Sequence, residues 1–310
     1  MNKKSNFDFR KYYDNLEGIG NGAFGIVYKG RNKKRDKLRA IKVIQLDKLK
    51  ENILANIGEE EELEAKFKEY IEGYINECEN MKICSNINSV KFYKYFKNKK
   101  EFTIIMELCD CNLLQFLLEN NKEGFSDEKI YEIMKQLNNG FKIMRDNKII
   151  HRDLKLENIL IKYKDNNKYI IKLADYGSSK RLNSLSQNYC YTNAGSLKYM
   201  APEILNGEKH NYKCDLWSIG VIMYRLKFVK FPFNGETLFA LIKNINNFNN
   251  NSLKETGNEK LDDLIKKLLE KNYKERINWD EYFNHPFFHT FSNKINLIYY
   301  KKKNKYSKNK

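Results

Sequence analysis

The chain has 310 residues, of which 41% are hydrophobic, which is enough for a large core arranged as two domains or one bilobal unit. Lys and Arg number 57 against 40 Asp and Glu, and this net charge of +17 fits nucleic-acid, membrane-surface or acidic partners as well as a lysine-rich solvated surface. No run of about 18 apolar residues occurs, so we expect no membrane span, and the apolar-free start predicts no secretory signal. The six Cys lack paired CxxC spacing, which argues against zinc and disulfide frameworks and for reduced cytosolic thiols.

In chain order, β-type segments come first and helical segments follow. Residues 14–46 alternate apolar and polar with Gly punctuation, which predicts strands, and residues 90–97 and 102–108 predict two more. Between them, residues 59–84 predict a helix with an apolar stripe of Leu63, Phe67, Tyr70, Ile71, Tyr74 and Ile75. Further helices are expected over residues 126–147, 213–228, 236–247, 259–271 and 279–284. This pattern predicts two lobes joined near residues 107–110.

The first chemical motif is a glycine-rich segment in which Gly20, Gly22 and Gly25 form Gly-x-Gly-x-x-Gly. Alone it is a weak signal, because dinucleotide-binding folds share it and ordinary turns contain such glycines. A dinucleotide loop opens a helix, whereas β-type residues follow here, so the glycines are expected in a hairpin. Such a hairpin allows backbone N–H groups to approach phosphate oxygens closely.

Lys42 lies in the apolar strand segment Ala40-Ile41-Lys42. A lysine is rarely buried without an anion, so either phosphates or a glutamate from the following helix is expected beside it. A strand lysine that faces solvent is the alternative.

The strongest signal is the octapeptide His-Arg-Asp-Leu-Lys-Leu-Glu-Asn at residues 151–158. Phosphoryl transfer needs a carboxylate that orients the hydroxyl and accepts its proton, a cation for the moving phosphoryl group, and an oxygen ligand for Mg²⁺. Asp153, Lys155 and Asn158 supply these three roles within one loop. Asp175, which follows the apolar strand of residues 169–174, is then a natural second Mg²⁺ ligand.

These motifs together resemble the protein kinase family over roughly residues 12–290. The resemblance implies an α+β bilobal fold, with a small lobe of five antiparallel strands and one helix, and a larger, mainly helical lobe. It divides the chain into an N-terminal extension (1–11), a small lobe (12–107), a large lobe (108–290) and a basic tail (291–310). ATP and Mg²⁺ are expected between the lobes. Lys155 and the pair Gly195-Ser196 resemble serine/threonine kinases rather than tyrosine kinases.

The resemblance also implies roles for single residues in the binding of ATP. Lys42 is expected to hold the α- and β-phosphates and to pair with a helix glutamate, for which Glu77 is favoured over Glu79. The adenine is expected between Val27, Ala40 and Leu160. Met106 resembles the residue that guards the back pocket, and Glu107 to Cys109 resemble the hinge that hydrogen-bonds the adenine edge.

Other family landmarks concern the support of the site. Arg276 resembles the arginine that pairs with Glu203 of Ala-Pro-Glu, and Asp215 begins a segment that resembles the buried central helix. A regulatory column of apolar contacts is expected to contain Met81, Phe92, Tyr176 and His151. Tyr176 replaces the usual Phe, and its hydroxyl needs a partner.

Lys42 and Glu77 stand 35 positions apart, more than is usual in the family. The excess, about residues 47–64, is expected to be an insertion or an extension of the following helix, and it contains four consecutive Glu at 59–62. It is either a solvated segment or, together with the basic tail, a docking site for a regulatory partner.

The resemblance predicts a cytoplasmic enzyme that acts on Ser or Thr of protein substrates, without membrane association and without specific nucleic-acid binding. The lysine-rich tail leaves nuclear entry open. Two alternatives are a catalytically inactive scaffold on the same fold and a basic nucleic-acid-binding protein.

Two expectations concern regulation and specificity. Thr192 stands at the family's usual activation-loop phosphosite, where Arg152 and Lys180 are expected to bind the phosphate, with Ser184, Ser186, Tyr189 and Tyr191 as competitors. Arg225 stands where relatives that prefer arginine before the phosphoacceptor have an acidic residue. We therefore expect no preference for basic peptides, unless Arg225 faces solvent or pairs with an acid.

Overall fold

The computed structural model describes residues 8–22, 25–57, 60–165, 168–176, 180–181, 194–249 and 252–291. The chain divides into two compact units. The first, here the sheet unit, comprises Met1–Asn112 and Leu160–Lys180, and the second, here the helical unit, comprises Leu113–Ile159 and Arg181–Lys310. The expected activation-loop phosphosite Thr192, its four competitors and tail residues 292–310 lie outside the described residues.

The sheet unit is built on a five-stranded sheet of order β1-β2-β3-β5-β4, in which every neighbouring pair is antiparallel. Its strands are β1 (Tyr13–Gly22), β2 (Gly25–Asn32), β3 (Lys37–Gln45), β4 (Phe92–Lys97) and β5 (Glu101–Met106). A 3-10 helix, η1 (Phe9–Lys11), precedes them. The five-stranded antiparallel sheet expected for the small lobe is therefore confirmed.

Strand alternation gives the two faces of this sheet different neighbours, because successive side chains point to opposite faces. On one face, Ile41, Val43 and Ile105 form a buried cluster with Phe9 and Tyr13. On the other face, Ala40, Lys42 and Ile44 pair with Met106, Ile104 and Phe102 of β5. Lys42 therefore shares its face with the residues against which a helix packs.

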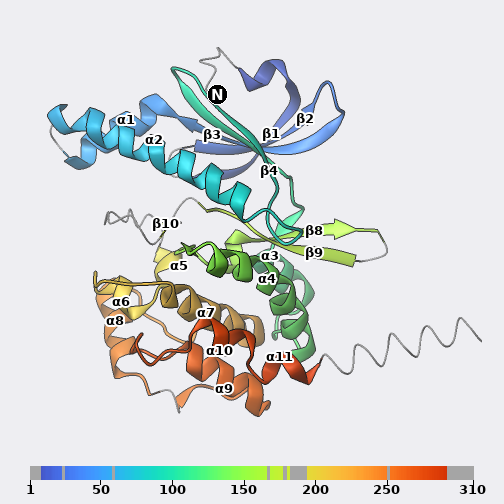
Figure 1. Cartoon of the computed structure of the whole chain (residues 1–310), viewed down its shortest axis with the longest axis vertical. Helices are drawn as coiled ribbons and strands as arrows, with labels where there is room; N and C mark the ends of the chain where they lie inside the picture. The colour runs from blue at the N-terminus through green and yellow to red at the C-terminus, as the bar shows by residue number, and fades with distance from the viewer. Residues whose placement is uncertain are drawn as a thin grey trace, which may run out of the picture. The chain divides into compact units, whose positions relative to one another are not determined.

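That helix is α2 (Glu60–Ile83), close to the expected 59–84, and it is accompanied by α1 (Leu46–Ile57), which lies beside it (Figure 1). Leu46, Leu49 and Ile53 of α1 are buried in one core with residues of α2, β3 and β5. The apolar stripe expected on the helix joins the same core: Leu63, Phe67, Tyr70, Ile71, Tyr74 and Ile75. The excess segment thus contributes a helix with one buried apolar face rather than a solvated loop.

A second, three-stranded sheet explains why residues 160–180 belong to the sheet unit. Its strands are β6 (Cys111–Asn112), β8 (Ile159–Lys164) and β9 (Lys168–Leu173), in the order β6-β8-β9. Main-chain hydrogen bonds from Val90 to Leu173 and from Leu173 to Asn88 tie β9 to the segment before β4. Asp175 lies two residues beyond the end of β9 and is therefore positioned by this unit.

The helical unit holds its helices around α7 (Lys213–Phe228), which is buried from Cys214 to Leu226 and contacts α4 and α9. Its other helices are α3 (Leu113–Asn120), α4 (Asp127–Asp146), η2 (Leu156–Asn158), α5 (Ala194–Leu197), α6 (Pro202–Leu205), α8 (Leu238–Asn247), α9 (Glu259–Leu268), α10 (Trp279–Phe283) and α11 (Phe287–Thr290). Two short strands, β7 (Ile149–Ile150) and β10 (Lys180–Arg181), complete the elements.

Local sequence accounts for several helix starts. Ser126 caps α4, because its side chain accepts a hydrogen bond from the Lys129 N–H, as the Ser-Asp-Glu signature suggests. Asn278 and Glu281 form a reciprocal capping box at α10. Among the described helices, none has both the length and the apolar character needed to cross a bilayer.

The buried face of α1 yields a stability prediction. Leu49 is fully buried, so Leu49→Ala leaves a cavity and should lower the free energy of unfolding by about 2–5 kcal/mol. Lys48→Ala, on the exposed face of the same helix, is the matched control and should stay within about 0.5 kcal/mol. Chemical denaturation measures both, and equal effects of the two substitutions would contradict the packing of α1.

Candidate active site

The glycine-rich motif lies in the hairpin between β1 and β2, as expected from the flanking β-type residues. Gly22 pairs with Gly25, and Gly20 pairs with Val27. At Gly25 a Cβ atom would stand 2.0 Å from the main-chain oxygen of Val43 in β3. Close approach of β3 therefore requires glycine at position 25, a packing reason that the motif alone does not reveal.

Lys42 lies beside two carboxylates of the sheet unit. Its Nζ donates to Glu77 Oε1 at 2.8 Å and lies 3.7 Å from Asp175 Oδ1. The expected pairing with Glu77 is thus present, while Glu79 pairs with Lys82 instead. Burial lowers the pKa of Lys42, but the Glu77 and Asp175 carboxylates raise it by more, so Lys42 remains a cation.

The two carboxylates beside Lys42 differ in exposure. The Glu77 side chain is 3% exposed, and its second oxygen, Oε2, is buried without a hydrogen-bond partner in the described part of the chain. The Asp175 side chain is 44% exposed. Glu77 is consequently a fixed anchor for Lys42, whereas Asp175 is open to a further cation.

The residues expected around the adenine all lie in the sheet unit. Val27 pairs with Lys42, and Ala40 pairs with Met106, so all four share one face of the sheet. Leu160 lies in β8, opposite Asn112.

The expected hinge follows β5. The Glu107 N–H already donates to the main-chain oxygen of Lys91, and the Glu107 carboxylate pairs with Lys172 at 3.0 Å. The main-chain groups of Cys109 have no hydrogen bond among the described residues. Burial raises the pKa of the Cys109 thiol to about 12, so the thiol stays neutral. Cys109 therefore offers the free donor and acceptor that an adenine edge needs.

Tyr176, after Asp175, is fully buried, and its hydroxyl lies 3.4 Å from Ser89 Oγ. Ser89 therefore supplies the partner that this hydroxyl needs, and no sequence motif points to Ser89. Met81 is buried and Phe92 partly buried in the same unit, and His151 belongs to the helical unit.

In the helical unit, the loop of residues 151–158 gathers three predicted residues. Lys155 Nζ donates to both Asp153 oxygens, at 2.7 and 3.0 Å, and to Ser196 Oγ at 3.0 Å. Asn158 Nδ2 donates to the main-chain oxygen and to Oδ2 of Asp153, at 2.9 and 2.8 Å. Because the amide nitrogen of Asn158 is used this way, its side-chain oxygen stays available to a ligand.

Asp215, at the start of α7, fixes this loop through hydrogen bonds to its main chain. It is fully buried and accepts hydrogen bonds from the N–H groups of His151 and Arg152, both at 2.8 Å. Arg152 has a positive φ of 66°, which a non-glycine residue adopts only when its surroundings enforce it. The sequence placed Asp215 at a buried helix start but did not reveal these two bonds.

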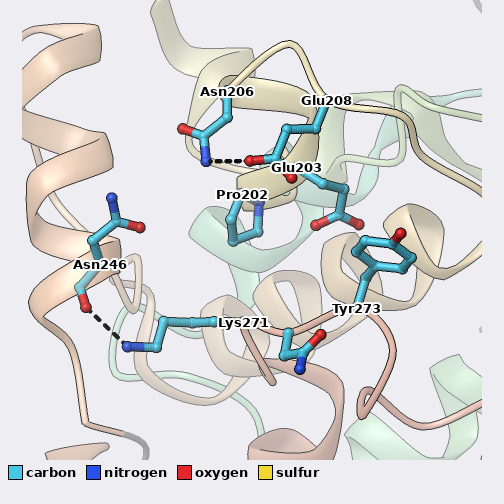
Figure 2. Close-up of a pocket in the computed structure, with 8 residues that line it drawn as sticks. Pro202, Glu203, Asn206, Glu208, Asn246, Lys271 and Tyr273 are labelled. Atoms are coloured by element: carbon cyan, nitrogen blue, oxygen red, sulfur yellow. Dashed lines mark hydrogen bonds between the residues drawn. The ribbon is translucent and has the colours of Figure 1, made fainter.

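Glu203 and Arg276 form a second buried pair, as the resemblance implied. Arg276 donates twice to the Glu203 carboxylate, at 2.7 and 2.9 Å, and both side chains are nearly inaccessible. Figure 2 shows the pocket beside this pair, where Asn206 donates to Glu208 and Lys271 donates to the main-chain oxygen of Asn246. None of the predicted catalytic or nucleotide-binding residues lines this pocket.

The architecture itself defines a class. A five-stranded antiparallel sheet whose third strand supplies a lysine to a helix glutamate, followed by a mainly helical unit with an Asp–Lys–Asn loop, is that of the protein-kinase-like phosphotransferases.

Comparison with known proteins gives the family. Residues 13–288 match the protein kinase domain family, and the chain belongs to this family, whose members use ATP and a divalent metal ion. It is 32% identical over 282 residues to the serine/threonine-protein kinase atg1 of Dictyostelium discoideum, covering 89% of this chain and 39% of that protein.

Two further relatives are similar to the same degree. The calcium-dependent protein kinase 4 of Plasmodium falciparum is 30% identical over 309 residues, covering 95% of this chain and 53% of the relative. The human serine/threonine-protein kinase Nek5 is 31% identical over 277 residues, covering 89% and 36%. The chain thus spans between about a third and about half of the length of these relatives.

The two bonds to Asp215 lead to a prediction about the loop. Asp215→Asn leaves one acceptor oxygen for two buried N–H groups, and an unsatisfied buried donor costs about 1–3 kcal/mol. We expect a lower melting temperature and faster hydrogen exchange of the His151 and Arg152 amides. Glu119→Gln, an exposed substitution in the same unit, is the control. Unchanged exchange across residues 148–158 in Asp215→Asn would show that Asp215 does not hold the loop.

Proposed function

We propose that the chain is an active serine/threonine protein kinase, which transfers the γ-phosphate of ATP to a hydroxyl of a protein substrate with the help of Mg²⁺. The observation that carries the proposal is the arrangement around Asp153, whose carboxylate is bonded by Lys155 and by Asn158 within one loop. The sheet unit supplies the complementary set of Lys42, Glu77 and Asp175. We propose that both sets act on one ATP molecule.

The nucleotide would be held by the sheet unit. Lys42 is a cation fixed by Glu77, and it would contact the α- and β-phosphates. The apolar residues Val27, Ala40 and Leu160 would contact the adenine, with Met106 at the back of the pocket. The main chain of Cys109, together with the main-chain oxygen of Glu107, would bond the adenine edge. Gly20 and Gly22 would allow the β1–β2 hairpin to approach the phosphates.

The oxygen donors suit Mg²⁺, a hard cation that usually takes one or two carboxylates plus substrate phosphates. Asp175 is nearly half exposed, and the Asn158 side-chain oxygen is unused. Among the described residues no cluster of three or more His, Cys, Asp or Glu side chains forms a metal site, which agrees with a cation held partly by its substrate. Bound there, Mg²⁺ would neutralise charge on the phosphates.

The transfer step would be supported by the loop of the helical unit. Asp153 would accept a hydrogen bond from the substrate hydroxyl, orient its oxygen toward the γ-phosphorus and take its proton as the new P–O bond forms and the bond to the leaving ADP oxygen breaks. Lys155, 18% exposed, would leave its contacts with Asp153 in part to stabilise the phosphoryl oxygens. Ser196, bonded to Lys155, would support this lysine.

Serine or threonine is the proposed acceptor because Lys155 and Ser196 resemble serine/threonine kinases, and because relatives are named as such kinases. The scaffold alternative is disfavoured, since Lys42, Asp153, Asn158 and Asp175 are all retained. Docking of a regulatory partner on residues 47–64 would have to use the exposed glutamates of α2, because the apolar face of α1 is buried.

The assignment of Asp153 predicts a selective loss of turnover. Asp153→Asn should lower kcat for phosphate transfer to a generic protein substrate by about 100-fold or more, because the proton acceptor is lost. Stabilisation of the protein by Mg-ATP in a thermal-shift assay should persist, since Lys42 and Glu77 are untouched. Asp165→Asn, at an exposed position beyond the end of β8 and outside the loop, is the control. Turnover near the wild-type value in Asp153→Asn would refute the assignment.

A further inference from the structure

Arg225, near the end of α7, is a buried cation without a carboxylate partner in the part of the chain that the structure describes. Arg225 is 9% exposed, and its guanidinium nitrogen Nη1 donates a hydrogen bond to the Tyr199 hydroxyl at 2.5 Å. The Nε atom is buried and has no hydrogen-bond partner among the described residues. Arg225 therefore neither extends into solvent nor pairs with an acid among the described residues, although a small part of it stays accessible.

Two aromatic rings lie beside Arg225, and one of them also contacts a second cation. The guanidinium carbon of Arg225 lies 4.2 Å from the centroid of the Phe231 ring and 5.7 Å from that of Tyr199. Lys198 Nζ lies 5.2 Å from the same Phe231 ring, so one partly exposed aromatic ring is shared by two cations. Aromatic faces attract a cation but do not neutralise it.

Tyr199 connects Arg225 to the loop that contains Asp153. Its hydroxyl accepts hydrogen bonds from Arg225 and, at 3.3 Å, from the Leu156 N–H, and it donates to Glu157 Oε2 at 3.2 Å. Burial, and next the Glu157 carboxylate, raise the pKa of the Tyr199 phenol, which therefore stays neutral. Arg225 is accordingly separated from the nearest carboxylate of its network by a neutral hydroxyl.

A buried arginine in this position is costly unless an anion comes to it. The neighbouring Lys227 has its own partner, Asp127. Residues 182–193 contain no Asp or Glu, so that segment has no carboxylate to offer. Among the described residues no carboxylate pairs with Arg225, which leaves the guanidinium able to bind an anion of another molecule.

We infer that Arg225, with Lys198 across the Phe231 ring, recognises an anionic side chain of the protein substrate, a carboxylate of Asp or Glu or a phosphate on Ser or Thr, near the phosphoacceptor. The inference rests on the proposed function, because Leu156 and Glu157 immediately precede Asn158 in the proposed transfer loop. The substrate is the favoured source, since its acceptor hydroxyl must reach Asp153 in that loop. Glu157, on the other side of Tyr199, would take no part in binding the anion.

The test uses phosphatase-treated full-length chain and serine peptides in an alanine background. Asp, Glu, phosphoserine or Arg is placed at each of the positions around the acceptor, and kcat/KM is measured. We expect an anionic residue at one or two positions to raise kcat/KM about fivefold to tenfold, chiefly through KM, where tenfold equals about 1.4 kcal/mol. Arg at the same positions should lower it. Comparing the Asp and Glu peptides with the phosphoserine peptides separates carboxylate from phosphate.

Three variants test whether Arg225 and Lys198 cause the preference for anionic peptides. Arg225→Gln should reduce the ratio of kcat/KM for the anionic peptide to that for the alanine peptide to about one. Lys198→Gln, a change at a partly exposed residue, should reduce the ratio at least twofold and carries the test if Arg225→Gln does not fold. Lys243→Gln removes one exposed positive charge from α8 and should leave the ratio unchanged.

The outcomes separate this inference from the proposed function. The inference alone is overturned if peptides with an anionic residue and peptides with alanine are phosphorylated with equal kcat/KM. It is also overturned if the Arg225 and Lys198 variants keep the wild-type ratio of these two kcat/KM values. A preference that disappears once the enzyme has phosphorylated itself identifies a phosphate of its own chain as the occupant and overturns the substrate assignment. No transfer to any peptide overturns the proposed function and the inference with it.

Discussion

The loop that carries Asp153 depends on a single buried carboxylate. Asp215 is fully enclosed, yet it accepts two consecutive main-chain N–H groups, from His151 and Arg152, at the point where Arg152 takes a positive φ. A strained residue of this kind costs about 1–3 kcal/mol and persists only where fixed groups enforce it. Burial raises the pKa of Asp215, while the adjacent His151 and the two N–H groups oppose that rise. The enclosure explains why α7 is apolar around its whole circumference: a helix that must carry a buried acceptor to the centre of the unit has no solvent face.

Lys42 plays the corresponding part in the sheet unit, and its position follows from strand alternation. Every second residue of β3 faces α2, so Ile44 enters the core while Lys42 meets Glu77. Helix α1 adds Leu46, Leu49 and Ile53 to that core, and it thereby braces the helix that presents Glu77. The contact with Asp175 is longer, at 3.7 Å, and more exposed. Glu77 is thus a buried partner of Lys42, whereas Asp175 is a more distant and more exposed one.

Much of this arrangement could be predicted from residue patterns, and the failures have a common physical cause. Alternation located the strands, and the apolar stripe located α2, because both periods are local. The pairs Lys42–Glu77 and Glu203–Arg276 came from the family resemblance and are present. The packing role of α1 is not predicted, because residues 47–64 are rich in charge and only two apolar side chains of α1 among them, Leu49 and Ile53, are buried. Ser89 opposite Tyr176, and the tight fit of Gly25 against Val43, depend on segments distant in sequence. The surroundings of Arg225 depend on distant segments in the same way, since the rings beside it come from Tyr199 and Phe231.

Helix α7 connects the two functions of the helical unit. Its Asp215 fixes the loop of Asp153, its Ser218 donates to the main-chain oxygen of Tyr199 at 2.8 Å, and its Arg225 donates to the hydroxyl of the same tyrosine. Tyr199 is therefore held at both ends by one helix, and it passes that support to the loop through the N–H of Leu156. A substrate group that binds Arg225 would meet a side chain already fixed relative to Asp153. Because the helix is rigid and buried, recognition of the anion and placement of the acceptor hydroxyl would require little reorganisation, which favours selectivity through preorganisation rather than through a large contact area.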